Sequence, residues 1–431
     1  MTRGSWAALL ILFGVLAACA VPPTTQTNRN NRRASDDAAE SAESGDENAD
    51  PDHGSDPSGQ VVGASCGAAP QKAIDTTALD PFFTAQMKAA NAPGLAVAVI
   101  GGGRIKWAKG YGLANIAENK PVTPDTIFML ASVSKTITAV ALMQLIEDPT
   151  RGLSLDQDIN GKLPFSVRNP TFASTPITYR MLLTHTSSLE DSDAFWAQTS
   201  PEPRTQGDSQ TSLLDFERSY VARSDSWSRS KPGTVKSYSN SATSLAGLLV
   251  ERISGTSLQS YAKTNIFDRL DMKESSFFLR DLDPSRVAMP YDGTPLVAKG
   301  HYGYPDYPDG LLRTSALQLS RFLLMFSQRG QCAQQRILKE TTFTQMATVQ
   351  APSIAANQGL IWYYDTKAGT KALGHNGADQ GVSTEMFFDP ATGAGYVLLT
   401  NGSANMAGVA SQENAMSAMG DKLMQLAKTL P

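Results

Sequence analysis

Short apolar runs near the two ends of the chain have the length and composition of β-strands. They are continuous or alternate with polar residues, and turn residues separate neighbouring runs. These patterns predict strands over 94–100, 104–111, 373–377, 382–388 and 396–400. Because strands occur both before and after a long central region, we expect one sheet built from both ends of the chain.

Apolar residues at intervals of three and four predict helices for much of the remaining chain. The predicted helices are 79–90, 132–148, 177–184, 241–254, 258–270, 315–326 and 413–430. A polar, proline-containing stretch at 187–210 is expected to form a surface loop. The predicted fold class is therefore α/β (α+β): a sheet flanked by helices, with an inserted, mostly helical subdomain over about 150–345.

Residues 19–72 differ from the rest of the chain in composition and charge. Within them, positions 20–65 contain three arginines against nine aspartates and glutamates, and almost no large apolar residue. Such a segment cannot bury enough apolar surface to fold, so we predict a disordered acidic tether ahead of a domain spanning 73–431. The acidic residues of this tether account for the negative formal net charge of the chain, −4. Without a clustered basic face, no nucleic-acid partner is expected.

The first 18 residues resemble a bacterial lipoprotein signal peptide. Arg3 precedes an apolar run, 6–18, that is too short to span a membrane. The run ends in Leu-Ala-Ala-Cys at positions 16–19, which is similar to a lipobox, so Cys19 is the expected lipidation site. Ala20 resembles the sorting pattern for the outer membrane. We expect an exported protein, lipid-anchored to the cell envelope on the periplasmic face; an ordinary secretory signal or an uncleaved anchor is the alternative.

Two cysteines follow the lipobox, at positions 66 and 332. Export places them in a compartment where disulfides persist, so we predict a bridge between Cys66 and Cys332. The alternative is two isolated buried thiols. The histidines and cysteines are too few and too scattered for a structural zinc site. No metal and no organic cofactor is therefore expected.

Ser132 and Lys135 stand three residues apart at the start of the apolar helix. Residues at this spacing share a helix face, which brings the lysine amine over the serine hydroxyl. A serine is a poor nucleophile until a base takes its proton, and a lysine can be that base when burial and a helix dipole favour its neutral form. The pair therefore predicts a serine nucleophile with a built-in base. The alternative is a serine helix cap followed by a lysine that extends to solvent.

Tyr238 and Asn240 lie in a loop that enters the helix predicted at 241–254. A tyrosine beside a lysine ammonium can exchange protons as a general base and acid. The amide of Asn240 can donate to a substrate carbonyl and order Lys135. The alternative is a tyrosine packed in a turn, with the asparagine as a helix cap. His185, at a helix end, is expected to have a structural role.

The motif His-Asn-Gly at 375–377 falls on a predicted strand. If this strand borders the nucleophile helix, His375 faces the substrate and Gly377 leads into a backbone N–H, that of Ala378. This N–H and that of Ser132 would then form an oxyanion hole. The alternative is a surface histidine in a hairpin.

In this order, Ser-x-x-Lys at 132–135, Tyr-Ser-Asn at 238–240 and His-Asn-Gly at 375–377 resemble the motifs of the serine β-lactamase and penicillin-binding-protein superfamily. They are most similar to the branch that holds class C β-lactamases, DD-carboxypeptidases, D-aminopeptidases and β-lactamase-like esterases. The resemblance covers most of residues 75–430. Further similar stretches lie at 182–189, 232–240, 266–272, 310–322 and 374–401. The resemblance implies a β-lactamase/transpeptidase-like fold with an antiparallel sheet.

The resemblance also implies a role for each motif residue. Ser132 is the acylated nucleophile, Lys135 is its partner, and Tyr238 is the base in acylation and the activator of water in deacylation. Substrate binding falls to Asn240, His375, Gly377 and Ala378. His375 stands where class C β-lactamases have lysine, which puts β-lactamase activity in doubt because a histidine near neutrality is only partly charged.

The sequence thus predicts an exported serine hydrolase that works through an acyl-enzyme on Ser132. The expected activity is that of a DD-carboxypeptidase or D-amino-acid peptidase on cell-wall peptides. A carboxylesterase or a weak β-lactamase of the same fold is the alternative. The alternative from another class is a non-catalytic, membrane-tethered penicillin-binding or sensor module. Expected partners are a small peptide, ester or β-lactam substrate and, through the lipid anchor, a membrane.

Overall fold

The computed structural model describes residues 66–67, 75, 77–199, 207–406 and 408–430. The predicted signal peptide, Cys19 and nearly all of the predicted tether lie outside the described residues. Contacts divide the chain into two units, Met1–Gln60 and Val61–Pro431, and everything described here belongs to the second unit. Within the described part of the chain, no helix is long and apolar enough to cross a membrane.

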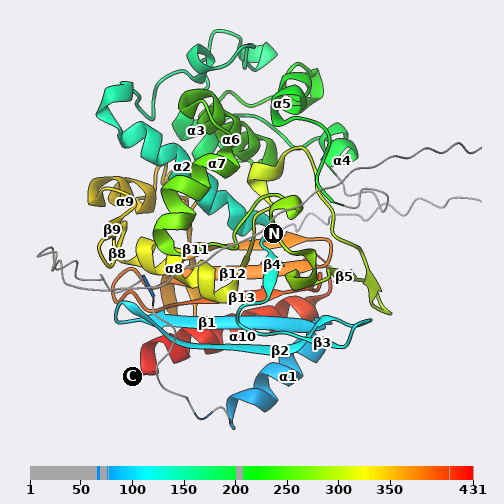
Figure 1. Cartoon of the computed structure of the whole chain (residues 1–431). Helices are drawn as coiled ribbons and strands as arrows, with labels where there is room; N and C mark the ends of the chain where they lie inside the picture. Colours follow the sequence, from blue (N-terminus) through cyan, green and yellow to red (C-terminus); the bar gives the residue numbers. More distant parts are fainter. Residues whose placement is uncertain (1–65, 68–74, 76, 200–206, 407, 431) are drawn as a thin grey trace, which may run out of the picture. The chain divides into compact units, whose positions relative to one another are not determined.

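A seven-stranded antiparallel sheet supports the second unit, in the order β10-β11-β12-β13-β1-β2-β3. Its strands are β1 (Gly94–Gly101), β2 (Arg104–Asn115), β3 (Lys120–Pro121), β10 (Tyr363–Lys367), β11 (Thr370–Asp379), β12 (Val382–Phe388) and β13 (Gly395–Thr400) (Figure 1). The two ends of the chain meet in the β1–β13 ladder, where Leu95 pairs with Thr400. The prediction of one antiparallel sheet built from both chain ends is confirmed.

Among the described residues, three short antiparallel strand pairs lie outside this sheet. They are β4 (Ile127–Met129) with β7 (Arg313–Ser315), β5 (Tyr291–Asp292) with β6 (Val297–Ala298), and β8 (Gln331–Cys332) with β9 (Gln335–Arg336). The β4–β7 pair bears on function because β4 leads directly into the turn that carries Ser132.

Helices cover both faces of the sheet. The α-helices of the described residues are α1 (Leu79–Ala89), α2 (Ser134–Glu147), α3 (Tyr179–Leu183), α4 (Asp193–Thr199), α5 (Leu213–Val221), α6 (Asn240–Ser254), α7 (Leu258–Ala262), α8 (Ala316–Ser327), α9 (Glu340–Ala347) and α10 (Ala410–Thr429). α8 packs on one face of β1 and β13, and α10 packs with α1 on the other. Figure 1 shows α2, α3, α5, α6 and α7 grouped away from the sheet. This group includes α2, which precedes the predicted subdomain boundary at about 150, and not α8, which packs on the sheet.

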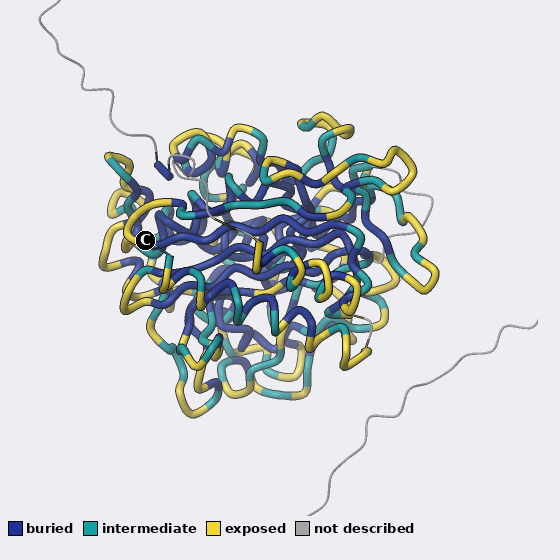
Figure 2. The backbone as a smooth tube through the Cα atoms, turned by 90° about the horizontal axis from the view of Figure 1, so that it is seen from below, coloured by how far each residue is buried: buried dark blue, intermediate teal, exposed yellow. Residues whose placement is uncertain are grey.

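The burial of β1 follows from its position between α8 on one face of the sheet and α10 with α1 on the other. Every residue of the strand is buried, and alternate side chains enter different cores because side chains alternate across a sheet. Val97 and its odd-numbered neighbours join the core shared with Met419 of α10, whereas Ala98 and its even-numbered neighbours join the core shared with α2 and α8. Figure 2 shows the sheet strands as buried between more exposed segments.

The prediction that 187–210 forms a surface loop is wrong for residues 187–199, whereas residues 207–210 form no helix or strand and are partly or largely exposed. Ser187 to Leu189 are buried, and α4 follows within the stretch. Phe195 of α4 packs its ring 5.3 Å from that of Tyr220 and 6.0 Å from that of Phe216. The polar composition of the stretch concealed this aromatic contact, whose partners lie on α5. Residues 200–206 lie outside the described residues.

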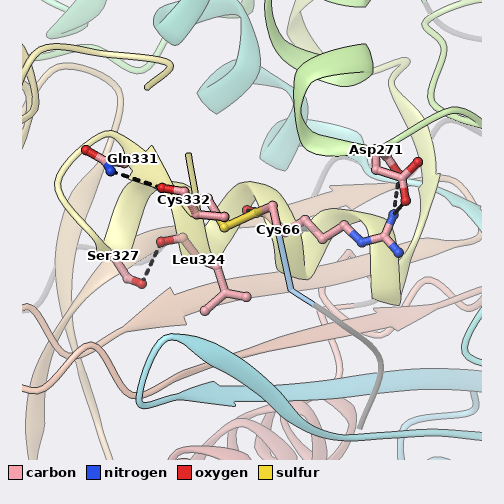
Figure 3. The surroundings of a disulfide bond; sticks show 8 residues. Cys66, Asp271, Leu324, Ser327, Gln331 and Cys332 are labelled. Carbon is pink, nitrogen blue, oxygen red and sulfur yellow. Dashed lines mark hydrogen bonds and ion pairs between the residues drawn. A yellow bond between two sulfur atoms is a disulfide. The ribbon is translucent and has the colours of Figure 1, made fainter. Parts of the chain in front are cut away.

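A disulfide joins Cys66 to Cys332, with 5.3 Å between the two Cα atoms. The predicted bridge is confirmed, and the alternative of two isolated thiols is wrong. Figure 3 shows the bond beside α8, next to Leu324 and Ser327 of that helix and Gln331 of β8. The bridge therefore ties residue 66 to the layer that packs on the sheet.

Candidate active site

Ser132 lies in a single 3₁₀ turn, η1 (Ala131–Val133), immediately before α2. It does not cap the helix: neither η1 nor α2 has a side-chain cap, so the alternative reading of Ser132 as a cap is wrong. The preceding residue, Ala131, has a φ of +47°, a conformation that a side chain makes costly. Thr384 of β12 donates to the carbonyl of Leu130 at 2.7 Å, which ties this strained turn to the sheet.

Two polar side chains converge on the hydroxyl of Ser132. The Nζ of Lys135 lies 3.1 Å from Ser132 Oγ, and the hydroxyl of Tyr238 lies 2.9 Å from the same atom. The structure thus brings together three residues that the sequence motifs singled out. A serine with two titratable groups within hydrogen-bond distance has the geometry of an activated nucleophile.

Lys135 is completely buried and paired with an acid that the sequence motifs did not reveal. Its Nζ donates to the backbone carbonyl of Asp309 at 2.8 Å and lies 3.2 Å from the Oδ2 of the same residue. Burial alone lowers the pKa of Lys135, but the charges of Asp309 and Tyr238 outweigh burial and raise that pKa above its ordinary value. The Asp309 contact thus favours the ammonium form of Lys135, the form beside which Tyr238 was expected to exchange protons.

Tyr238 faces solvent from the loop before α6, and 46% of its surface is exposed. One face of its ring lies against the imidazole of His185, with 4.5 Å between ring centroids, and Lys135 Nζ lies 5.3 Å from the Tyr238 centroid. The phenol is thus held in place by its ring while its hydroxyl stays accessible. The alternative of a tyrosine packed into a turn does not describe this residue.

His185 and Asp191 hold the loop that carries Tyr238. His185 is buried, and its Nδ1 accepts a hydrogen bond from the N–H of Ser239 at 3.2 Å, as expected for a structural histidine. Asp191 accepts from the N–H groups of Asn240 and Ser241, at 2.8 and 3.1 Å, where α6 begins. Burial raises the pKa of Asp191 to about 6, although both N–H groups lower it. Asn240 is thereby fixed at the first position of α6.

His375 lies on β11 and is only 2% exposed, so the alternative of a surface histidine is wrong. Its Nδ1 lies 2.6 Å from the carbonyl of Asn376. Because a carbonyl only accepts, Nδ1 carries the proton and Nε2 is left as an acceptor. Burial lowers the pKa of His375 to about 3. The expectation of a partly charged histidine is corrected: His375 is neutral at neutral pH.

Gly377 allows β11 to approach the nucleophile turn. A Cβ at this position would lie 2.4 Å from Thr384 Oγ1 and 2.5 Å from the carbonyl oxygen of Leu130, closer than real side chains come. The residue after it, Ala378, lines the same cavities as Ser132. The oxyanion hole formed by the Ser132 and Ala378 N–H groups stays a prediction. The close approach of β11 to the Ser132 turn is compatible with it.

Two cavities meet at Ser132. The wide cavity has a volume of about 680 Å³ and is lined by Ser132, His185, Glu190, Asp191, Trp196, Lys236, Ser237, Tyr238, Asn240, Asn357, Gln358, Tyr363, His375, Asn376 and Ala378. The acidic cavity has a volume of about 140 Å³, and its lining includes Ser132, Asn240 and Ala378 together with Asp306, Asp309 and Asp379. Among the described residues, no group of three or more histidines, cysteines and carboxylates is arranged to hold a metal ion.

Sequence motifs located the residues that touch Ser132 but missed Asp309, Asp191 and Lys236. Asp309 is 174 positions from Lys135, and no local spacing links the two. Asp191 stands two positions after the family-like stretch at 182–189, which is the one signal that could have indicated it. Lys236 stands two positions before Tyr238 and lines the wide cavity, so its proximity to the motif was the available clue.

Comparisons with known proteins agree with this fold and site. The family model described as Beta-lactamase matches residues 79–418, and the chain therefore belongs to the Beta-lactamase family. This confirms the predicted superfamily and its class, a β-lactamase-related serine hydrolase.

Among curated proteins, Protein flp of Staphylococcus aureus (strain MRSA252) is 23% identical over 330 residues, which cover 75% of this chain and 62% of the relative. The D-alanyl-D-alanine-carboxypeptidase/endopeptidase AmpH of Escherichia coli (strain K12) is 26% identical over 282 residues, 63% of this chain and 69% of AmpH. The chain thus spans less than two thirds of the length of Protein flp.

Two solved structures extend the comparison of the fold. The octameric penicillin-binding protein homologue from Pyrococcus abyssi is 27% identical, with a TM-score of 0.66 over 83% of this chain and 79% of its own. The D-amino acid amidase from Ochrobactrum anthropi SV3, complexed with L-phenylalanine amide, is 20% identical, with a TM-score of 0.67 over 81% of this chain and 97% of its own. At that identity the amidase shows the shared fold alone.

Proposed function

We propose that this protein hydrolyses small D-amino-acid peptides of cell-wall origin through an acyl-enzyme on Ser132, as a DD-carboxypeptidase or D-amino-acid peptidase. The observation that carries the proposal is the convergence of Lys135 Nζ and the Tyr238 hydroxyl on Ser132 Oγ, at 3.1 and 2.9 Å, in the wall of the wide cavity. The names of the relatives support the substrate class, since they include a D-alanyl-D-alanine-carboxypeptidase/endopeptidase.

Acylation begins when Ser132 Oγ attacks the scissile carbonyl carbon. Tyr238, as the general base in its deprotonated form, accepts the hydroxyl proton as the new C–O bond forms. The electron pair of the carbonyl moves onto its oxygen, where the N–H groups of Ser132 and Ala378 stabilise the charge. When this intermediate collapses, the C–N bond breaks and the leaving amine takes the proton from Tyr238.

Deacylation repeats the same proton transfers with water. A water molecule attacks the ester carbonyl and gives its proton to Tyr238, again in its deprotonated form. The Ser132 ester bond then breaks, and Tyr238 returns the proton to Ser132 Oγ. Throughout both steps Lys135 stays an ammonium paired with Asp309, so every proton is transferred through Tyr238.

We expect a substrate carboxylate to form an ion pair with the Lys236 ammonium and not with His375. Lys236 lines the wide cavity beside Tyr238 and has no ion-pair partner among the residues that the structure describes. Burial lowers the pKa of Lys236 somewhat, as expected for a half-buried amine. The neutral imidazole of His375 can instead accept a hydrogen bond from the substrate at Nε2.

A carboxylester is the second candidate substrate, because a neutral His375 suits substrates that lack a carboxylate. A β-lactam carries a carboxylate that would depend on Lys236, so we expect it to be turned over slowly. Initial rates on a D-Ala-D-Ala peptide, on short-chain p-nitrophenyl esters and on a chromogenic cephalosporin rank the three substrate classes. The highest kcat/KM is expected on the peptide. A higher value on the esters would make the protein an esterase.

Intact mass spectrometry tests the acyl-enzyme. Incubation with a penicillin or with p-nitrophenyl acetate should add the acyl mass to the wild type and not to Ser132→Ala. Tyr238→Phe should slow the addition by about 10²–10⁴-fold, the usual contribution of a positioned general base. No adduct with any β-lactam or activated ester would exclude the hydrolase and favour a non-catalytic binding module.

We also infer that the protein is exported and anchored to the cell envelope by a lipid on Cys19. The lipobox-like sequence supports this, and so does the Cys66–Cys332 disulfide, since such bonds persist in oxidising compartments. Labelled fatty acid should be incorporated by the wild type but not by Cys19→Ala, and the variant should move to the soluble fraction. Equal labelling of both proteins would contradict the assignment.

A further inference from the structure

One hydrogen-bonded pair of side chains in the wide cavity has no role in the steps above. The hydroxyl of Tyr363 donates to Oδ1 of Asn376 at 2.9 Å, and both residues line the cavity. Asn376 lies between His375 and Gly377 on β11, whereas Tyr363 begins β10 and belongs to none of the sequence motifs. The fold therefore adds a residue to the motif strand that no motif contains.

The register of the sheet explains why Tyr363 reaches Asn376. Tyr363 pairs directly with Gly374, and this pair is the last of the β10–β11 ladder. Because side chains alternate along a strand, Asn376 lies on the same face as Gly374 and is a diagonal neighbour of Tyr363. Gly374 has no side chain to come between them. The ring of Tyr363 is supported by His375, with 5.2 Å between ring centroids, and by Phe387, with 5.6 Å.

This hydrogen bond determines which end of the Asn376 amide is available to a ligand. An asparagine side chain has an oxygen that accepts and an NH₂ group that donates. Burial raises the pKa of Tyr363 above its ordinary value, so the phenol keeps the proton that it donates. With Oδ1 bonded to this phenol, Nδ2 is the end left for a ligand. Asn376 is exposed at the cavity, so it is held there as a hydrogen-bond donor.

Asn376 shares the cavity with the cation that the proposed function assigns to a substrate carboxylate. Lys236 lines the same cavity, and its charge is near enough to His375 to lower the pKa of that imidazole. Because Asn376 follows His375 on β11, Asn376 and Lys236 lie near the same part of the cavity. A carboxylate has two oxygens, which a charged amine and a directional N–H donor can both satisfy. A carboxamide has one oxygen and no charge, so it gains less from the same two groups.

We propose that Tyr363 is a positioning residue that holds Asn376 as a hydrogen-bond donor to the carboxylate of the leaving group. The inference rests on the proposed function and narrows it: with Lys236, this donor selects peptides whose leaving group is a C-terminal residue with a free carboxylate. Tyr363 acts through Asn376 on binding and not on the reacting atoms. Loss of the Tyr363 hydroxyl should therefore raise KM and leave kcat nearly unchanged.

Two matched peptides and two matched variants test this role. N-acetyl-D-Ala-D-Ala and its C-terminal amide share the scissile bond and differ only in the carboxylate. Tyr363→Phe keeps the ring and should lower the ratio of kcat/KM for the acid to that for the amide about three- to tenfold, the usual contribution of one hydrogen bond. Tyr364→Phe, the same change one residue along β10, should keep the wild-type ratio, because Tyr364 lines a separate cavity.

Asn376→Asp replaces the donor by a negatively charged acceptor. This change should reverse the preference, so that the amide becomes the better substrate. Circular dichroism checks that Tyr363→Phe and Asn376→Asp fold; if the second does not fold, the ratio for Tyr363→Phe decides alone. An unchanged ratio in Tyr363→Phe, or an equal loss on both peptides as a merely structural role would give, would overturn the proposal.

Binding to Ser132→Ala separates this proposal from the proposed function. Titration of Ser132→Ala with both peptides should show tighter binding of the acid even if the wild type hydrolyses neither. The double variant Ser132→Ala/Tyr363→Phe should show a smaller preference. An equal preference in the two proteins, or no binding of either peptide, would overturn the role of Tyr363. Hydrolysis of both peptides by the wild type with an unchanged ratio in Tyr363→Phe would overturn it while leaving the hydrolase intact.

Discussion

The Oδ2 atom of Asp309 lies 3.2 Å from the Nζ of Lys135, and the two residues form a buried ion pair directly behind the nucleophile. The pair links η10 (Tyr307–Asp309) to α2, since Lys135 also donates to the main-chain carbonyl of Asp309. Its electrostatic consequence is that Lys135 keeps its proton. The proposed mechanism uses this pair: in it, Tyr238 exchanges protons with Ser132 and Lys135 supplies the positive charge.

Replacing Asp309 by asparagine should shift the alkaline limit of activity. The folded-state pKa of Lys135 is raised, so the wild type loses the ammonium only as pH rises through a high value. Asp309→Asn removes the carboxylate but keeps the main-chain acceptor, so Lys135 should deprotonate at a lower pH. We expect the descending limb of kcat against pH to move down by at least one pH unit. Asp125→Asn, the same change at an exposed carboxylate outside both cavities, serves as a control. An unmoved limb would show that the Asp309 charge does not hold Lys135.

The structure also shows why part of this site was visible in the sequence and part was not. Ser132 and Lys135 are three residues apart, so a local rule of helix geometry links them. Asp309 meets Lys135 only through the packing of η10 on α2 and α6, and no spacing rule reaches across 174 positions. The raised pKa of Lys135 depends on that distant contact, so the sequence alone left open whether Lys135 or Tyr238 takes the serine proton.

The fold was predictable where the pattern of apolar and polar residues alone determines the secondary structure. The run at 94–100 has no polar side chain because β1 is covered on both faces. The late strands β12 and β13 are also buried at every position, although β12 includes three polar residues. The stretch containing Phe195 failed for the opposite reason. Its few apolar residues are spaced among polar ones, and they form a core only with Phe216 and Tyr220 from another helix. Sequence pattern reports how apolar a segment is but not which partner it meets.

Lys236 should determine the affinity for substrates that carry a carboxylate. Lys236→Met keeps the length of the side chain and removes its charge. We expect KM for a D-Ala-D-Ala peptide to rise about tenfold, equivalent to about 1.4 kcal/mol of binding, with little change in kcat. Lys231→Met, an exposed lysine of the same loop, is the control and should keep the wild-type KM. If an uncharged p-nitrophenyl ester lost as much affinity as the peptide, the effect would not be electrostatic.

Asp191 should make stability depend on pH between about 4 and 7. Burial raises its folded-state pKa to about 6, above the ordinary 3.8. The folded protein therefore binds a proton more tightly than the unfolded chain, and the resulting stability is full below the unfolded pKa and is lost as pH rises through 6. Relative to Asp191→Asn, the wild type should become less stable across this range. Urea unfolding of both proteins at pH 4, 5, 6 and 7 measures the trend; a constant difference would contradict it.

The Cys66–Cys332 bridge should contribute to the stability of the domain. It closes a loop with a sequence separation of 266 residues, and cross-links of this kind restrict the unfolded chain. Replacing both cysteines by serine should lower the free energy of unfolding by about 2–4 kcal/mol. Urea titrations with and without a reducing agent measure the loss. The reducing agent should destabilise the wild type and leave the double variant unaffected, because that variant has no bridge to break. Equal midpoints for the wild type in both conditions would show that the bridge does not stabilise the fold.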